Sequence, residues 1–159
     1  MAVDAKPITH VLDRELLYRS VRDADDHHSC DSDGKLIRLG QSTFNDPERK
    51  PSVSRADLCV LGSEASRLAP EHGVVTLSAV EVRGIAGVIS NNSKGKLLFV
   101  HNVDVVHVPV EENYAHGQIE SSPHASSDGA WKKLKEALCQ IALMRGWTCP
   151  PASSRNMRQ

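Results

Sequence analysis

The stretch SDGAWKKLKEALCQIALMRG, residues 127–146, carries the clearest secondary-structure signal in the chain. Its apolar residues recur every three or four positions, and its lysines lie mostly outside that stripe. Ser127 or Asp128 is suited to cap the amino end, and Gly146 to end the helix. Arg145 is favoured near the negative end of the helix dipole. The stretch therefore predicts an amphipathic helix packed through one face, formed by Trp131, Leu134, Leu138, Ile141 and Ala142.

Upstream of this helix, short runs of apolar residues bounded by turn-forming residues predict strands. The predicted strands cover residues 15–21, 35–39, 73–77, 96–100 and 103–108. A second helix is predicted from an N-cap at Ser54 to about Leu68, because Leu58, Leu61 and Ala65 fall at helical spacing and Pro70 follows. Ser78 is suited to cap a short helical turn that ends near Val82.

The number of predicted strands and the single strong helix favour the α+β fold class. We expect one compact domain of mainly antiparallel strands with two principal helices, spanning residues 1–148. A chain of 159 residues is of single-domain size. Residues 149–159 begin with Cys149-Pro150-Pro151, and we expect them to form a flexible C-terminal tail.

Composition narrows the possible functions. The net charge is -1, with 19 basic and 20 acidic residues, and only 4% of the residues are aromatic, so nucleic-acid binding is not expected. No window resembles a signal peptide or a membrane span, so no membrane partner is expected. The four cysteines form no CxxC pair, which favours a reducing, cytoplasmic location.

The segment Asp26–Gly34 contains His27, His28 and Cys30, all of which are competent metal ligands. Their spacing matches no closed zinc site, and the segment lacks the late glutamate of a calcium loop. We expect a solvated acidic loop and no metal, although the sequence leaves metal binding by these three residues open.

Three short islands far apart in the chain carry polar groups: Tyr18-Arg19, Ser42-Thr43-Phe44 and Gln118-Ile119-Glu120. A reaction at the anomeric carbon of nicotinamide riboside needs three groups of these kinds. A guanidinium holds phosphates by paired hydrogen bonds, and a small hydroxyl residue lets the ribose approach. A carboxylate stabilises the positive charge that develops as nicotinamide leaves.

The order of these islands resembles the Arg–Ser–Glu pattern of small ADP-ribosyltransferase-type domains, a group that includes many bacterial toxins and NAD-degrading proteins. The resemblance implies that Arg19 binds the phosphates of NAD and that Ser42 or Thr43 shapes the nicotinamide pocket. It further implies that Glu120 is the catalytic carboxylate and Gln118 its upstream partner. NAD would be the substrate of such a domain.

The outline of the chain also resembles small bacterial proteins of no assigned activity, which share an early arginine strand and a late Asn-x-Ala-His. The second feature is Asn113-Tyr114-Ala115-His116 here. This resemblance directs attention to His116, because an imidazole is suited to general-base catalysis. Gly117 beside it would let a ligand approach closely. We treat His116 and Glu120 as the catalytic candidates, in a segment that otherwise connects a strand to the last helix.

Two classes of function remain open. In the first, the chain is a bacterial ADP-ribosyltransferase-like domain that binds or cleaves NAD, so Arg19, Ser42 or Thr43, and His116 or Glu120 converge in one pocket. In the second, it is a non-catalytic accessory module of a multi-protein bacterial system. That module would contact a protein partner through the 128–146 helix or the strand edges, and an exposed apolar patch would mark the contact.

Overall fold

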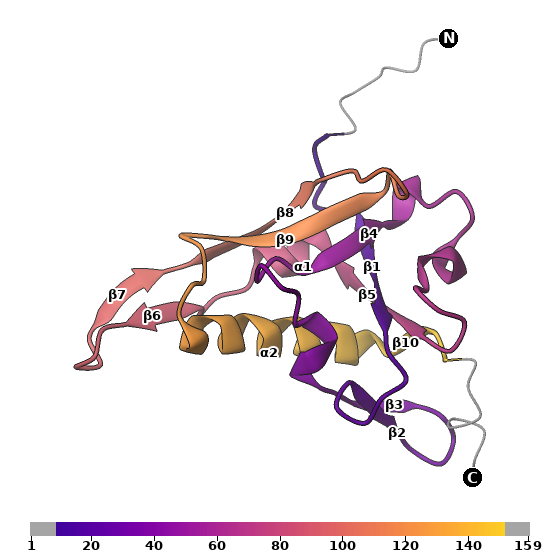
Figure 1. Ribbon diagram of the computed structural model, residues 1–159, viewed down its shortest axis with the longest axis horizontal. Coiled ribbons are helices and arrows are strands. Elements are labelled where there is room, and N and C mark those ends of the chain that lie inside the picture. Colours follow the sequence, from indigo (N-terminus) through magenta and orange to yellow (C-terminus); the bar gives the residue numbers. More distant parts are fainter. Residues whose placement is uncertain (1–8, 152–159) are drawn as a thin grey trace.

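The computed structural model describes residues 9–151, in which six antiparallel strands form one sheet (Figure 1). Their order across the sheet is β10-β5-β1-β4-β9-β8. The strands are β1 Leu16–Val21, β4 Ser52–Arg55, β5 Gly73–Ser78, β8 Asn102–His107, β9 His116–Ser122 and β10 Trp147–Cys149.

Two hairpins and two helices complete the domain. One hairpin joins β2 His28–Cys30 to β3 Leu36–Leu39, and the other joins β6 Ile89–Asn91 to β7 Leu97–Val100. The helices are α1 Ala79–Arg83 and α2 Asp128–Arg145, with short 3-10 turns η1 Gln41–Phe44, η2 Ala56–Leu58 and η3 Ser63–Ser66. The predicted α+β class, with mainly antiparallel strands and two helices, is confirmed.

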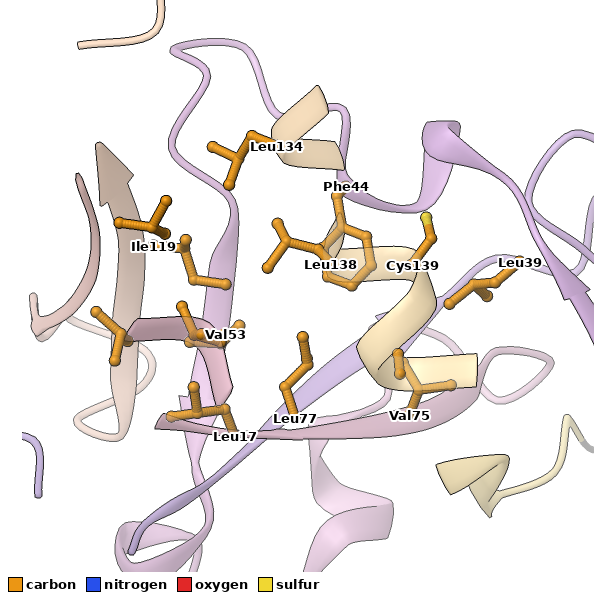
Figure 2. Close-up of a cluster of buried hydrophobic side chains, with 14 of the residues drawn as sticks. Leu17, Leu39, Phe44, Val53, Val75, Leu77, Ile119, Leu134, Leu138 and Cys139 are labelled. Atoms are coloured by element: carbon orange, nitrogen blue, oxygen red, sulfur yellow. The ribbon is translucent and has the colours of Figure 1, made fainter. Parts of the chain in front are cut away.

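Helix α2 covers one face of the sheet, and the core lies between them (Figure 2). Leucines and valines that alternate along the strands point toward the helix, where Leu134 and Leu138 are fully buried. Phe44 of η1 fills the space beside Leu138. Each such side chain contributes on the order of 1.5–3 kcal/mol relative to remaining exposed. The labelled sheet residues are Leu17, Val53, Val75, Leu77 and Ile119.

The predicted ends of α2 are confirmed. The Ser127 hydroxyl accepts a hydrogen bond from the Ala130 amide at 3.2 Å, which satisfies a backbone donor that the first turn leaves free. Gly146 follows the helix with φ of 74°, a conformation that costs glycine little. Ser78 likewise caps α1, where Glu81 completes a capping box.

The predicted helix from Ser54 to Leu68 is wrong. Ser54 lies within β4, and the segment after it forms only η2 and η3, separated by Gly62 with φ of 86°. The apolar spacing had misled because this segment has no core to face: Leu61 and Leu68 are 83% and 84% exposed. Helical periodicity stabilises a helix only where a core can receive its apolar face.

Two other predicted boundaries differ in the structure. The segment around His116 is a strand, β9, which pairs with β4 and β8, instead of a connecting loop. At the carboxyl end, Cys149 belongs to β10, and Pro151 is buried, so the domain extends past residue 148. Residues 152–159 of the predicted tail lie outside the described residues.

Candidate functional site

A row of four side chains crosses the sheet on the face opposite α2. Thr76 of β5 pairs with Tyr18 of β1, Tyr18 with Ser54 of β4, and Ser54 with His116 of β9. Directly paired residues of neighbouring antiparallel strands point to the same face. Because alternate residues such as Leu17 and Ile119 face the core, this row faces away from it.

The segment between β4 and β5 lies over this row and closes a cleft of about 270 Å³, which we call the polar cleft. Ser66, Leu68 and His72 contribute its outer side. Arg19, Arg22, His27 and Thr43 line its end, and the remaining lining residues are Tyr18, Ser20, Asp46, Ser52, Val53, Ser54, Asn113 and His116.

A second hollow of about 600 Å³ adjoins the polar cleft, and we call it the apolar compartment. The two share Ser54, Ser66, Leu68, Asn113 and His116 in their walls. The compartment's other lining residues are mainly apolar or aromatic and include Leu58, Val60, Leu61, Val110 and Tyr114. His116 therefore stands where a polar and an apolar space meet.

The tautomer of His116 follows from its contacts. Its Nδ1 lies 2.7 Å from the carbonyl oxygen of Val108, and a carbonyl only accepts, so Nδ1 carries the proton of the neutral ring. Among the described residues, Nε2 has no hydrogen-bond partner, and in this tautomer it is an acceptor. The Asn113 side chain accepts from the Ala115 amide at 3.0 Å and donates to Ser54 Oγ, which fixes the turn before β9.

Gly117 serves strand packing in the structure, whereas the sequence indicated that it would let a ligand approach. A Cβ at this position would lie 2.9 Å from the carbonyl oxygen of Val106 on β8. Glycine is therefore needed for close packing of β9 on β8, and this contact accounts for it without a ligand.

Arg19 lies beside the cleft, but its donors are already used. Nε and Nη2 donate to the carbonyl oxygen of Thr43 at 2.9 and 2.6 Å, and both terminal nitrogens bind the Asp46 carboxylate. Nη1 also donates to the Ser52 carbonyl at 2.7 Å. This clasp holds the segment between η1 and β4 against β1, so a phosphate would have to displace these contacts to bind Arg19.

Of the other predicted site residues, only Thr43 lines the polar cleft. Thr43 lines the polar cleft, although it is buried and donates its hydroxyl to the His27 carbonyl, whereas Ser42 is not among the cleft residues. Gln118 and Glu120 share the outward face of β9 with His116, but four residues of strand place Glu120 about 13 Å from it. Glu120 instead lines an open depression beside Lys50, 3.9 Å away.

Several residues of the polar cleft had not been predicted to contribute to this site. His27 and His72 come from segments far apart in the chain, and burial is the main factor that lowers the pKa of each imidazole below 6.5. The Arg22 guanidinium has no hydrogen-bond partner within residues 9–151 and remains available to an anion. The alternation of β1 signals that Tyr18 and Ser20 share a face, but only the register of the sheet brings His72 and His116 to them.

Within the described part of the chain, no group of three or more His, Cys, Asp or Glu side chains is arranged to hold a metal ion. His28 packs edge-on against Trp147, and its Nδ1 donates to the Arg22 carbonyl at 3.0 Å. No helix between residues 9 and 151 combines the length and apolarity needed to cross a membrane.

Comparisons of the chain with models of protein families, with curated proteins and with solved structures gave no match.

Proposed function

We propose that the chain is an ADP-ribosyltransferase-like domain that binds NAD in the polar cleft and apolar compartment and cleaves its nicotinamide–ribose bond. The observation that carries this proposal is that Arg19, Thr43 and His116, from three distant parts of the sequence, line one cleft. A pocket with a few convergent polar groups is the usual form of a small-molecule site.

The two adjoining spaces match the chemistry of a dinucleotide, which has an anionic centre and heteroaromatic ends. Arg22 supplies a guanidinium to the polar cleft for the phosphates. The apolar compartment offers Tyr114, which is 56% exposed, and leucine side chains against which a base can stack.

His116 replaces Glu120 as the group proposed to act on the bound molecule. His116 lines both spaces, and its Nε2, an acceptor in the neutral ring, is suited to take a proton from an attacking water or hydroxyl. Glu120 lines a different depression. NAD, the substrate implied by the resemblance, would thus be acted on by His116 instead of Glu120.

Incubation with NAD tests the proposal. The wild-type chain should release nicotinamide and should melt at a higher temperature in the presence of NAD. His116→Gln should lower the release rate on the order of a hundredfold, because the base is lost. Arg22→Ala should weaken NAD binding and reduce the melting shift.

Glu120→Gln is the matched control, since Glu120 also lies on β9 but lines neither the polar cleft nor the apolar compartment. This variant should leave nicotinamide release and the NAD-dependent melting shift unchanged. If the wild-type chain neither releases nicotinamide nor melts at a higher temperature with NAD, the proposal is refuted. A loss of release in Glu120→Gln alone would restore the assignment implied by the Arg–Ser–Glu pattern.

A second candidate function is that of a protein-interaction module, and the β6–β7 hairpin favours it. This hairpin projects from the body of the domain (Figure 1), and its residues Leu97–Val100 are each 50–57% exposed. The apolar stripe of α2, by contrast, is turned into the core. A protein partner is therefore expected on the hairpin and not on the 128–146 helix.

Site-specific photocrosslinking in bacterial cells separates these surfaces. A photoreactive residue in place of Phe99 should give a discrete heavier species, because partner side chains would cover this position. The same residue in place of Lys133, on the exposed side of α2, is the control and should give none. A discrete species from position 133 but not from position 99 would place the partner on the helix instead.

A further inference from the structure

On the floor of the polar cleft, the Oγ atom of Ser20 lies 2.9 Å from Nδ1 of His72. The same Oγ is 3.1 Å from the Leu68 amide nitrogen, which can only donate. The hydroxyl can accept from the Leu68 amide and at the same time donate its proton to Nδ1. In this arrangement Nδ1 is the acceptor, and a neutral His72 carries its own proton on Nε2.

The surroundings of His72 favour the neutral ring that a base requires. Burial is the largest influence and lowers the pKa of His72 below 6.5, with a smaller contribution in the same direction from Arg22. Glu71 and Asp23 oppose this shift without cancelling it. At pH 7 the imidazole is therefore mostly unprotonated while it accepts the Ser20 proton.

We propose that Ser20 is a nucleophile activated by His72, and that the polar cleft presents the carbonyl of a small ester to it. A hydroxyl within hydrogen-bond distance of a neutral imidazole is the common arrangement of an activated serine. The Arg22 guanidinium at the same cleft is the charge suited to an anionic group of the ester or to the developing oxyanion. This inference does not depend on NAD being a ligand.

The chemical step is an acyl transfer. Ser20 Oγ attacks the carbonyl carbon, the new C–Oγ bond forms, and the bond from that carbon to the leaving alcohol oxygen breaks. His72 Nδ1 takes the Ser20 proton and gives it to the leaving oxygen. Water then attacks the acyl-serine with His72 as base, which releases the carboxylic acid and restores Ser20.

The same two hydrogen bonds also tie the segment 66–72 to β1, so the test must separate reactivity from support. An alkyl fluorophosphonate does this, because only an activated serine reacts with it readily. Ser20 Oγ bonds to phosphorus, fluoride leaves and the proton passes to His72. Peptide mapping of the unaltered chain should find the phosphonyl group on Ser20, a result that needs no variant to fold.

Two variants complete the test, each checked for a cooperative melting transition. Ser20→Ala should abolish labelling at this peptide, and His72→Gln should slow it on the order of a hundredfold. His124→Gln, which lies in the separate depression beside Glu120, should label like the wild type. Labelling of Ser20 no faster than in urea-unfolded chain, or equally fast in folded His72→Gln, would overturn the proposal.

Discussion

At the scale of single residues, the most demanding electrostatic feature is the ion pair of Glu15 and Arg55, which are 2% and 3% exposed. Arg55 donates to both carboxylate oxygens, at 2.8 and 2.9 Å. Burial alone would raise the pKa of Glu15. The hydrogen bonds from Arg55 and from the Leu12 amide, with the Arg55 charge, lower it below its ordinary 4.5.

The sign of the pH dependence follows from that shift. Because the pKa of Glu15 is lower in the folded than in the unfolded chain, the carboxylate contributes stability that is complete above 4.5. That contribution is lost as the pH falls through the lower, folded value.

Glu15→Gln should lower the free energy of unfolding at pH 7 by about 3 kcal/mol, because it leaves Arg55 buried without its counter-charge. Urea denaturation measures the loss, and the variant should also lose less stability than the wild type between pH 5 and pH 3. Asp57→Asn is the control. It removes the carboxylate of the exposed 3.8 Å pair with Arg14 and should change little. Wild-type stability in Glu15→Gln would contradict the assignment.

At the scale of elements, the Arg19 clasp holds the segment between η1 and β4. Arg19→Lys keeps the charge but lacks the forked donors, so it should cost about 2 kcal/mol of unfolding free energy. It should also speed trypsin cleavage after Arg49, because that segment loses its anchor. Arg14→Lys, at an exposed position, should do neither. Unchanged stability and proteolysis in Arg19→Lys would show that the Arg19 clasp does not stabilise the folded chain in solution.

The elements also show what local sequence can predict. Helix α2 was predictable because its cap, its apolar stripe and its terminal glycine agree with one another. The segment after Ser54 has the same apolar spacing without a core opposite it. Strand β9 was missed because its inward positions include Gly117 and Ser121, which interrupt the apolar alternation expected of a strand.

At the scale of the whole molecule, the candidate site is a product of sheet register. Tyr18, Ser54 and His116 are separated by dozens of residues, and each is ordinary in its own sequence window. No local sequence pattern predicts that these three side chains meet, because strand pairing joins residues that lie far apart in the chain. The Arg–Ser–Glu resemblance implied that Arg19, Ser42 or Thr43, and Glu120 converge, and of these only Arg19 and Thr43 line the polar cleft. It failed to anticipate that the direction of β9 carries Glu120 away from them.

Hydrogen exchange should map this organisation. The amides of β1 and β5 should exchange most slowly, since β1 is paired on both sides and β5 is fully buried. The β6–β7 hairpin, with four exposed apolar residues on β7, should exchange much faster in the isolated chain. Mass spectrometry of peptic fragments measures both. Core-like protection of residues 97–100 in the chain alone would show that this hairpin is already covered.

The two tryptophans of the chain lie at opposite ends of α2, so their fluorescence can report on each end of the helix. Trp131 lies in its first turn, where the indole Nε1 is 3.3 Å from Asn45 Oδ1. Trp147 comes directly after the capping Gly146, and the Trp147 ring fills the space that a side chain at Gly73 would need. Replacing either indole by phenylalanine leaves one emitter, so fluorescence can follow the two ends of the helix separately as it docks on the sheet.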